Sequence, residues 1–178
     1  ITPPHDVGIM DAVSALRDYN KLKTMKKEDA VAEGLYISIG QEIDDKYIAV
    51  LKEQVKNPEI IKAVQKDIKI VYTPLHGTGN LPVRRVLKEL GFENVYVVEE
   101  QEKPDGAFPT VGYPNPESEE AFELAVKLGN EVGADLLLAT DPDADRLGVY
   151  IKGSKPGTYH ILTGNMSGCL IAEYEISQ

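Results

Sequence analysis

Short apolar runs alternate with longer amphipathic segments in the middle of the chain, and this alternation restricts the fold more than any other feature. The apolar runs are 68–72, 94–98 and 135–139, and the segments between them are 80–90 and 117–132. Runs of about five residues match strands, whereas longer segments with a period of about 3.6 residues match helices. A strand–helix–strand–helix–strand order predicts parallel strands joined by right-handed crossovers. We therefore predict an α/β fold, a three-layer α/β/α domain with a mainly parallel sheet.

Weaker patterns predict further elements on both sides of this core. Leu35, Ile37 and Ile39 occupy alternate positions, which predicts a short strand that ends at Gly40. The other expected elements are helices at 9–19, 44–55, 60–64 and 164–174 and strands at 147–152 and 159–162. We expect the loops 73–79 and 140–146 to lie at one edge of the sheet, because each leaves the carboxyl end of a strand.

The charge balance excludes some classes of partner. The formal net charge is −10 and the sequence pI is about 4.8. A nucleic acid or an anionic membrane surface requires a cationic protein surface, so we expect neither as a partner. An anionic small substrate remains compatible with this composition, because a few basic side chains and a metal ion can neutralise one phosphate.

Cysteine content and hydropathy indicate a cytoplasmic protein. Cys169 is the single cysteine, so no internal disulfide can form, which fits a reducing compartment. Its apolar helical surroundings predict a buried and unreactive thiol. No apolar run approaches the length of about 18 residues that spans a membrane, and no signal peptide opens the sequence. The start at Ile1 does not resemble a natural start, so we expect an excised fragment.

An acidic loop follows the third apolar run. Asp141, Asp143 and Asp145 occupy alternate positions, and Arg146 comes next. In an extended segment alternate side chains point the same way, so we expect the three carboxylates to converge. Such a cluster repels itself unless a cation binds, and carboxylate oxygens select hard cations such as Mg²⁺. We predict a Mg²⁺ site with open positions for a phosphate oxygen, with Arg146 in a salt bridge or in contact with that phosphate.

Other interpretations of this loop exist. The calcium EF-hand pattern fails, because Arg146 occupies its glycine position and Lys152 its final glutamate position. The haloacid-dehalogenase pattern fits in its first half, but Asp145 stands where Thr or Val is expected. The loop can also be a solvated acidic turn without metal on a scaffold domain, because Asp and Pro are common in turns.

A glycine loop follows the first apolar run and opens the helix at 80–90. Gly77 and Gly79, with Glu99 at the end of the next strand, resemble part of the fingerprint of a Rossmann-like nucleotide-binding module, although Pro82 replaces the third glycine. More generally, backbone N–H groups at a helix N-terminus favour an anion. The simplest alternative is a tight glycine turn in which His76 is a packing or capping residue.

Four motifs in this order carry a resemblance to a known family. They are Thr-Pro-Leu-His-Gly-Thr-Gly at 73–79, Pro-Asp-Gly-x-Phe-Pro at 104–109, Asn-Pro-Glu at 115–117 and Ala-Thr-Asp-Pro-Asp-Ala-Asp-Arg at 139–146. Together they resemble the second domain of the α-D-phosphohexomutases, nearest to the phosphoglucomutase/phosphomannomutase branch with its phosphopentomutase-like members. The resemblance covers residues 35–155.

The resemblance implies one domain of a four-domain enzyme. The family's other domains carry a catalytic serine loop, a sugar loop and a phosphate loop, and this sequence contains none of the three. We therefore expect residues 1–34 to be the exit from domain one and a linker. Residues 35–157 would be the metal-binding domain two, and residues 158–178 the start of domain three.

The resemblance also implies an activity and a set of site residues. The family performs intramolecular phosphoryl transfer on a hexose phosphate, through a phosphoserine and a bisphosphate intermediate. The residues expected to bind Mg²⁺ are Asp141, Asp143 and Asp145. Arg146 would contact the transferring phosphate, and His76, Gly77 and Thr78 would lie at the substrate or at an interface with the remaining domains of the chain. We expect the 178 residues alone to be inactive.

Overall fold

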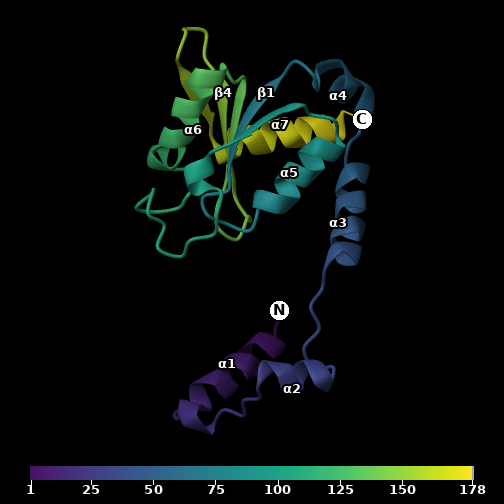
Figure 1. Cartoon of the computed structure of the whole chain (residues 1–178), viewed down its shortest axis with the longest axis vertical. Coiled ribbons are helices and arrows are strands. Elements are labelled where there is room, and N and C mark those ends of the chain that lie inside the picture. Colours follow the sequence, from purple (N-terminus) through teal and green to yellow (C-terminus); the bar gives the residue numbers. More distant parts are fainter. Residues whose placement is uncertain (178) are drawn as a thin grey trace. The chain divides into compact units, whose positions relative to one another are not determined.

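The computed structural model describes residues 1–177, and the chain divides after Gly40 into two compact units (Figure 1). The first unit contains α1 (His5–Ala15), the short 3₁₀ helix η1 (Tyr19–Lys21) and α2 (Lys27–Ala32). The second contains, in chain order, α3 (Gln41–Glu53), α4 (Pro58–Val64), β1 (Lys69–Thr73), α5 (Asn80–Glu89), β2 (Asn94–Val97), the 3₁₀ helix η2 (Glu99–Gln101), α6 (Glu119–Val132), β3 (Leu136–Thr140), β4 (Leu147–Lys152), β5 (Tyr159–Leu162) and α7 (Gly164–Ile176).

The sheet of the second unit has five strands in the order β2-β1-β3-β4-β5. β1 pairs in parallel with both β2 and β3, and Tyr72 lies opposite Val97 on one side and Leu138 on the other. β4 is antiparallel to β3 and to β5. The α/β class is confirmed, and the sheet is mixed. Its parallel part ends at β3 because residues 141–146 are too few for the crossover of about a dozen residues that a parallel pair needs.

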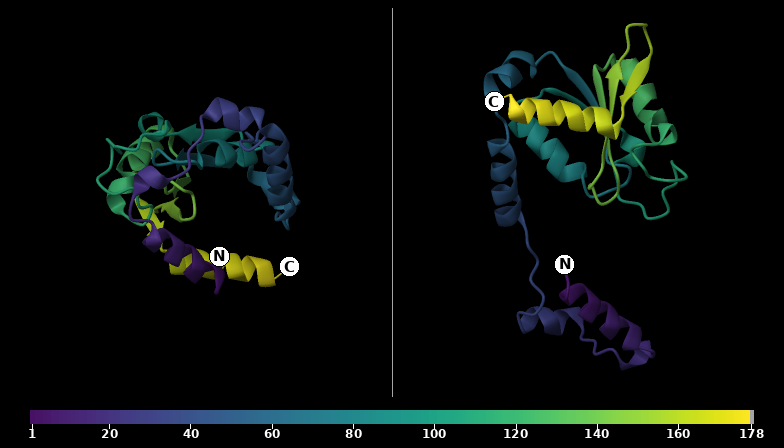
Figure 2. Two further views of the ribbon diagram at one scale, coloured as in Figure 1. Left: turned by 90° about the horizontal axis from the view of Figure 1, so that it is seen from below. Right: turned by 180° about the vertical axis from the view of Figure 1, so that it is seen from behind.

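Helices cover both faces of this sheet, as expected for three layers. Figures 1 and 2 show α6 on one side of the sheet and α5 and α7 on the other. α6 packs on β1 and β3, α7 on β4 and β5, and α3 packs on α5. The apolar run that predicted β3 is explained by this arrangement, since a strand covered on both faces has no solvent-facing side.

The main hydrophobic core lies between α6 and the sheet. Val71 and Leu137 of the sheet and Phe122 of α6 are fully buried there. The Phe122 ring stacks on Tyr150 of β4, with 4.1 Å between ring centroids and an interplanar angle of 30°. α6 therefore fixes the positions of β1, β3 and β4, and with them the loops that leave these strands.

Two sequence predictions about exposed segments are wrong. The predicted strand at 35–39 does not form: Leu35, Ile37 and Ile39 are 70%, 78% and 73% exposed, and no described strand pairs with them. Alternation of apolar residues alone does not make a strand, because the backbone N–H and C=O groups of a strand need hydrogen-bond partners on a neighbouring strand. Cys169 is exposed rather than buried. None of the residues of α7 is buried, and its apolar residues Met166, Leu170 and Ile171 are each at least half exposed.

The first unit buries little of its apolar surface within the described residues. None of the residues of α1 is buried, and Val7, Met10 and Val13 are each more than half exposed. Lys27 of α2 lies over the Tyr36 ring, 5.0 Å from its centroid. Among residues 1–177, no helix combines the length and the apolar character needed to cross a lipid bilayer.

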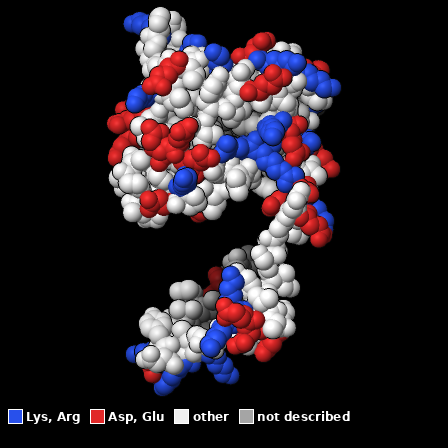
Figure 3. All heavy atoms as spheres, in the orientation of Figure 1, with Lys and Arg blue, Asp and Glu red and all other residues white. Residues whose placement is uncertain are grey.

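Lys and Arg side chains gather over α5 on the face drawn in Figure 3. Arg85 is ion-paired with Asp45 of α3 and with Glu89, its Nε lying 2.9 Å from the Glu89 carboxylate, and Arg84 is ion-paired with Glu102. These side chains are about one third exposed or more, so solvent screens each pair and its contribution to stability is small. The pair between Asp45 and Arg85 joins α3 to the helix that follows the glycine loop.

The residue after α6 offers a test of the helix terminus. Gly133 has a φ of 69°, and a Cβ there would meet no atom within 4 Å. Gly133→Ala is expected to lower the free energy of unfolding by about 1 kcal/mol, because only the left-handed backbone conformation opposes the side chain. Gly133→Asn is expected to cost less, since asparagine tolerates this conformation. Urea denaturation measures both, and equal stability of the alanine variant and the wild type would contradict the explanation.

Candidate metal centre

The loops after β1 and β3 meet at the edge of the sheet, as predicted from the parallel strand order. Thr78 donates two hydrogen bonds to the Pro142 carbonyl, from its backbone N–H at 2.8 Å and from its hydroxyl at 3.1 Å. A Cβ on Gly77 would lie 2.5 Å from the Pro142 Cα, closer than real Cβ contacts occur. Glycine at position 77 is therefore explained by the close approach of the two backbones.

Gly79, like Gly77, stands where a side chain would clash, but its neighbours are the ends of β1 and β3. A Cβ on Gly79 would lie 2.6 Å from both the Tyr72 hydroxyl and the Thr140 hydroxyl. These two hydroxyls share a hydrogen bond of 2.8 Å that joins the ends of β1 and β3. Burial raises the pKa of Tyr72, and the hydrogen bond to Thr140 lowers it in part. Both glycines of the partial nucleotide fingerprint therefore pack against the acidic loop and its strand, rather than leaving space for a ligand.

The three predicted carboxylates do converge. One ligand oxygen from each of Asp141, Asp143 and Asp145 lies within 4.8 Å of the other two. The reason differs from the prediction, because the loop is a turn and not an extended segment. The Ala144 N–H donates to the Asp141 carbonyl at 3.0 Å, and Ala144 has a φ of 59°. The left-handed residue in this turn brings the side chains on either side of it back toward Asp141.

The negative charges of the three carboxylates are only partly compensated by their neighbours. A hydrogen bond with Asp141 raises the pKa of Asp145, and the charges of Asp143 and Asp141 raise it further. Arg146 compensates in part, since its Nε lies 3.3 Å from an Asp141 oxygen and 3.7 Å from an Asp145 oxygen. A divalent cation would relieve this repulsion, and three carboxylates are suitable ligands for Mg²⁺. The donor set therefore fits the predicted ion.

Asp141 is the fixed member of the cluster. It is only 3% exposed, and its Oδ1 accepts the backbone N–H of Arg146 at 3.0 Å. Asp143 and Asp145 are exposed, so two of the three side chains remain accessible from solvent. A buried, oriented carboxylate together with two accessible ones leaves the cluster open on one side, where a further ligand can approach.

Tyr113 is a neighbour of the site that the sequence did not indicate. A hydrogen bond between its side chain and Arg146 raises the pKa of the guanidinium. Tyr113 comes from the Pro- and Gly-rich loop 102–118 and is 61% exposed. The guanidinium thus lies between the acidic cluster and an exposed tyrosine. No periodic pattern in the sequence could have placed this loop beside Arg146.

His76 lies in the glycine loop but is not directed toward the cluster. It is 6% exposed, its Nδ1 lies 2.9 Å from the Lys103 carbonyl, and its Nε2 lies 2.9 Å from the Thr110 hydroxyl. The ring also contacts Phe108 edge to face, with 6.2 Å between centroids. Both ring nitrogens are therefore occupied within the protein, in agreement with the alternative of a packing residue.

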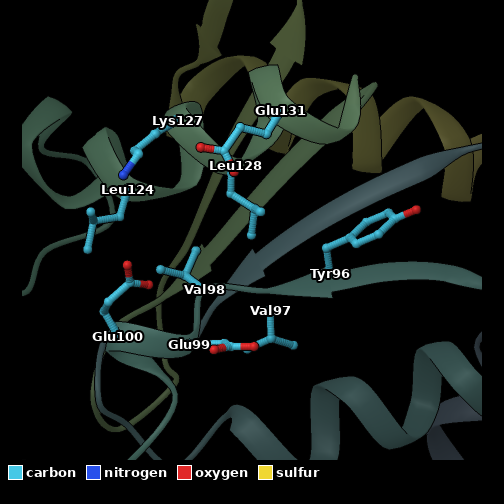
Figure 4. Close-up of a pocket in the computed structure, with 9 residues that line it drawn as sticks. All are labelled: Tyr96, Val97, Val98, Glu99, Glu100, Leu124, Lys127, Leu128 and Glu131. Carbon is cyan, nitrogen blue, oxygen red and sulfur yellow. The ribbon is translucent and has the colours of Figure 1, made fainter.

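Glu99 lies elsewhere. It lines a groove of about 600 Å³ at the outer edge of β2, shown in Figure 4, together with side chains of α6 such as Leu124 and Lys127. The glycine loop instead opens α5, on the other face of the sheet. Glu99 is exposed and belongs to η2. The groove therefore lies on the α6 side of the sheet, whereas the helix that the glycine loop opens lies on the other side.

Comparisons with known proteins identify the family. Residues 45–154, more than half of the chain, match the family described as phosphoglucomutase/phosphomannomutase, alpha/beta/alpha domain II. A phosphoribomutase of Saccharomyces cerevisiae is 35% identical over 98% of this chain and 29% of its own length. A phosphoglucomutase of Staphylococcus aureus is 44% identical over 64% of this chain and 20% of its own length. The chain thus spans about a third or less of the length of these relatives.

A solved structure shares the fold. The phosphoglucomutase/phosphomannomutase family protein of Burkholderia thailandensis has a TM-score of 0.56 and 21% sequence identity. The likeness covers 84% of this chain and 30% of that protein. The acidic loop, the glycine loop and strands β1 to β4 all lie inside the matched residues 45–154. The chain belongs to the phosphoglucomutase/phosphomannomutase family and contains the family's α/β/α domain II.

Proposed function

We propose that the chain supplies the Mg²⁺-binding loop of a sugar-phosphate mutase that moves a phosphoryl group within a hexose phosphate. The observation that carries the proposal is the convergence of Asp141, Asp143 and Asp145 within 4.8 Å, at the carboxyl edge of the sheet and inside the residues that match the family. Ligands of open α/β sheets bind at this edge. A bound Mg²⁺ would neutralise negative charge on the phosphoryl group.

Each residue has a part in the proposal. Asp141 is the oriented ligand, and the accessible Asp143 and Asp145 complete the carboxylate set. Arg146 contacts the phosphate, since its half-exposed guanidinium can turn from the carboxylates toward an anion. Thr78 and Gly77 hold the acidic loop from behind and contribute to the interface with the remaining domains of the chain.

A chimera tests this function. Residues 45–154 are placed in the corresponding segment of the Staphylococcus aureus phosphoglucomutase, to which the chain is 44% identical over 114 residues. We expect the chimera to convert glucose 1-phosphate in a coupled assay. We also expect its Asp143→Ala variant to lose at least about a hundredfold in turnover, because a metal supplies several kcal/mol to such reactions. A folded but inactive chimera, or full activity of the variant, would refute the proposal.

The same assay applies to the chain by itself. The 178 residues contain no serine loop that could carry the phosphoryl group. We therefore expect no turnover of glucose 1-phosphate above the background rate at any Mg²⁺ concentration. Measurable turnover by the purified chain would overturn the proposed division of labour between its domains.

The raised pKa of Asp145 predicts a pH dependence of metal binding. Asp145 in the metal-free fold holds its proton to a higher pH than a free aspartate, whose pKa is about 4. Proton and metal compete, so Mg²⁺ affinity should fall as the pH is lowered through this raised pKa. Conversely, the metal-free fold should lose stability as the pH rises through the same value. Calorimetric titrations at several pH values check the first sign, and urea denaturation without metal checks the second.

A further inference from the structure

A chain of buried hydrogen bonds lies behind the glycine loop. Its centre is Gln101, which is 1% exposed. The Gln101 Oε1 accepts the Thr73 hydroxyl at 2.7 Å, and its Nε2 donates to the Thr110 hydroxyl at 3.2 Å. Thr110 in turn lies 2.9 Å from the His76 Nε2. The network therefore joins the end of β1, the glycine loop and the loop after η2.

The donors and acceptors of this network form one consistent order. Thr110 receives the Gln101 amide and can give its own proton to the His76 Nε2. The His76 Nδ1 then carries the remaining ring proton and donates it to the Lys103 carbonyl at 2.9 Å. Every side-chain polar group in the series finds a partner, which is the condition under which a buried polar network rigidifies its surroundings.

The network holds a strained segment of backbone. Leu75 and His76 have φ values of 47° and 61°, in the left-handed region that non-glycine residues rarely adopt. Such a conformation persists only when the surroundings enforce it. Here the His76 N–H donates to the Gln101 carbonyl at 2.9 Å, the Leu75 N–H donates to the Thr73 hydroxyl at 3.2 Å, and the His76 ring is held at both nitrogens.

The strained segment leads directly to the acidic loop. Gly77 and Thr78 follow His76, and Thr78 binds the Pro142 carbonyl twice. Pro142 lies between Asp141 and Asp143 in the sequence. The contacts therefore run without a gap from the Gln101 side chain, through two left-handed residues, to the backbone between two of the predicted metal ligands.

We propose that Gln101 is a positioning residue for the metal centre: it fixes the conformation of the glycine loop, and through Thr78 and Pro142 it fixes the spacing of the three carboxylates. This inference rests on the proposed Mg²⁺ site. It assigns a role to a residue outside the four sequence motifs, and the role accounts for a fully buried polar side chain where an apolar one would otherwise pack. It also gives His76 a part at the site without any contact to metal or substrate.

The test compares variants of the 178-residue chain. Gln101→Met keeps the volume of the side chain and removes both hydrogen bonds, and Thr110→Val breaks the network one step further on. Thr110→Ser keeps the hydroxyl and should restore wild-type behaviour. Tyr159→Phe is the matched control, because it removes a partly buried hydrogen bond to the Ala134 carbonyl near the opposite ends of the strands.

Two measurements separate positioning from stability. The first is Mg²⁺ affinity followed by NMR titration. Gln101→Met and Thr110→Val should weaken binding by about 10–100-fold, the range for outer partners of metal ligands, while Tyr159→Phe and Thr110→Ser keep the wild-type value. The second is hydrogen exchange without metal. After correction for any difference in global stability, the Thr78 and Ala144 amides should exchange faster in Gln101→Met than in Tyr159→Phe.

The outcomes distinguish the two proposals. If the wild type binds no Mg²⁺ but the amide exchange of Thr78 and Ala144 still depends on Gln101, the proposed metal function fails and the mechanical coupling stands. If the wild type binds Mg²⁺ and the affinities of Gln101→Met and Thr110→Val equal those of the control, the positioning role is refuted. If Gln101→Met does not fold, Thr110→Val decides, because it leaves the Gln101 contacts with Thr73 and His76 in place.

Discussion

Replacing Gly77 with alanine is expected to lower the free energy of unfolding by about 1–3 kcal/mol, the range for overpacked sites. The added methyl would lie 2.5 Å from the Pro142 Cα and 2.7 Å from the Pro142 carbonyl oxygen. These are backbone atoms, so no side-chain rotation can relieve the clash. The loops after β1 and β3 must separate, and the hydrogen bonds from Thr78 to Pro142 are lost with their contact. Mg²⁺ affinity should therefore fall by at least about tenfold in the same variant.

The control for this variant is Gly106→Ala. Gly106 lies in a loop of the same unit, and a Cβ there would meet no atom within 4 Å. Its substitution should leave both the free energy of unfolding and Mg²⁺ affinity close to the wild-type values. Thermal denaturation and NMR titration measure the two quantities. Wild-type metal affinity in a destabilised Gly77→Ala protein would show that the junction is structural and does not set the ligand geometry.

Asp143→Ala is expected to weaken Mg²⁺ binding by more than about tenfold, since even outer partners of metal ligands contribute that much. The stability of the metal-free protein should stay the same or rise, because the charge of Asp143 opposes ionisation of Asp145. A loss of affinity without a loss of stability is characteristic of a binding residue. Calorimetry of the 178-residue chain gives the affinity, which we expect to be weak in the wild type because the proposed phosphoserine ligand is not among these residues.

Asp67→Ala is the matched control for Asp143→Ala. Asp67 is an exposed aspartate in the turn before β1, and its removal changes the net charge by the same amount. It should leave Mg²⁺ affinity unchanged. Tight binding that survives Asp143→Ala, or an equal loss in both variants, would mean that Mg²⁺ responds to overall charge and not to the loop.

The regular elements of the second unit could be predicted because the spacing of apolar residues in each element reflects which of its faces are buried. The run at 135–139 is apolar at nearly every position, and no residue of β3 is exposed, three being buried and two half-buried. The strand predicted at 35–39 failed because alternation says nothing about a partner strand. The antiparallel direction of β4 was available in the sequence, since residues 141–146 cannot form a crossover, but the α/β alternation before it favoured a parallel sheet.

The convergence of the three carboxylates could be predicted from the sequence, but the residues that support the loop could not. Asp141, Asp143 and Asp145 are adjacent in sequence, so their convergence needed only a local argument, although the left-handed Ala144 in the turn was not foreseen. Tyr113 comes from the long loop 102–118 and Gln101 from η2 just before it, and the path of both segments depends on tertiary contacts. Their approach to Arg146 and to the glycine loop leaves no periodic signal in the sequence.

The central claim is that the loop at 141–146 binds a divalent metal ion, and Mn²⁺ tests it most directly. In heteronuclear NMR spectra of the 178-residue chain, low concentrations of Mn²⁺ should broaden the amide signals of Asp141 to Arg146 and of Thr78 before any others. Excess Mg²⁺ should reverse the broadening, and Asp143→Ala should remove it. Broadening that begins elsewhere, such as at the acidic groove around Glu99 and Glu131, or that persists in Asp143→Ala, would contradict the claim.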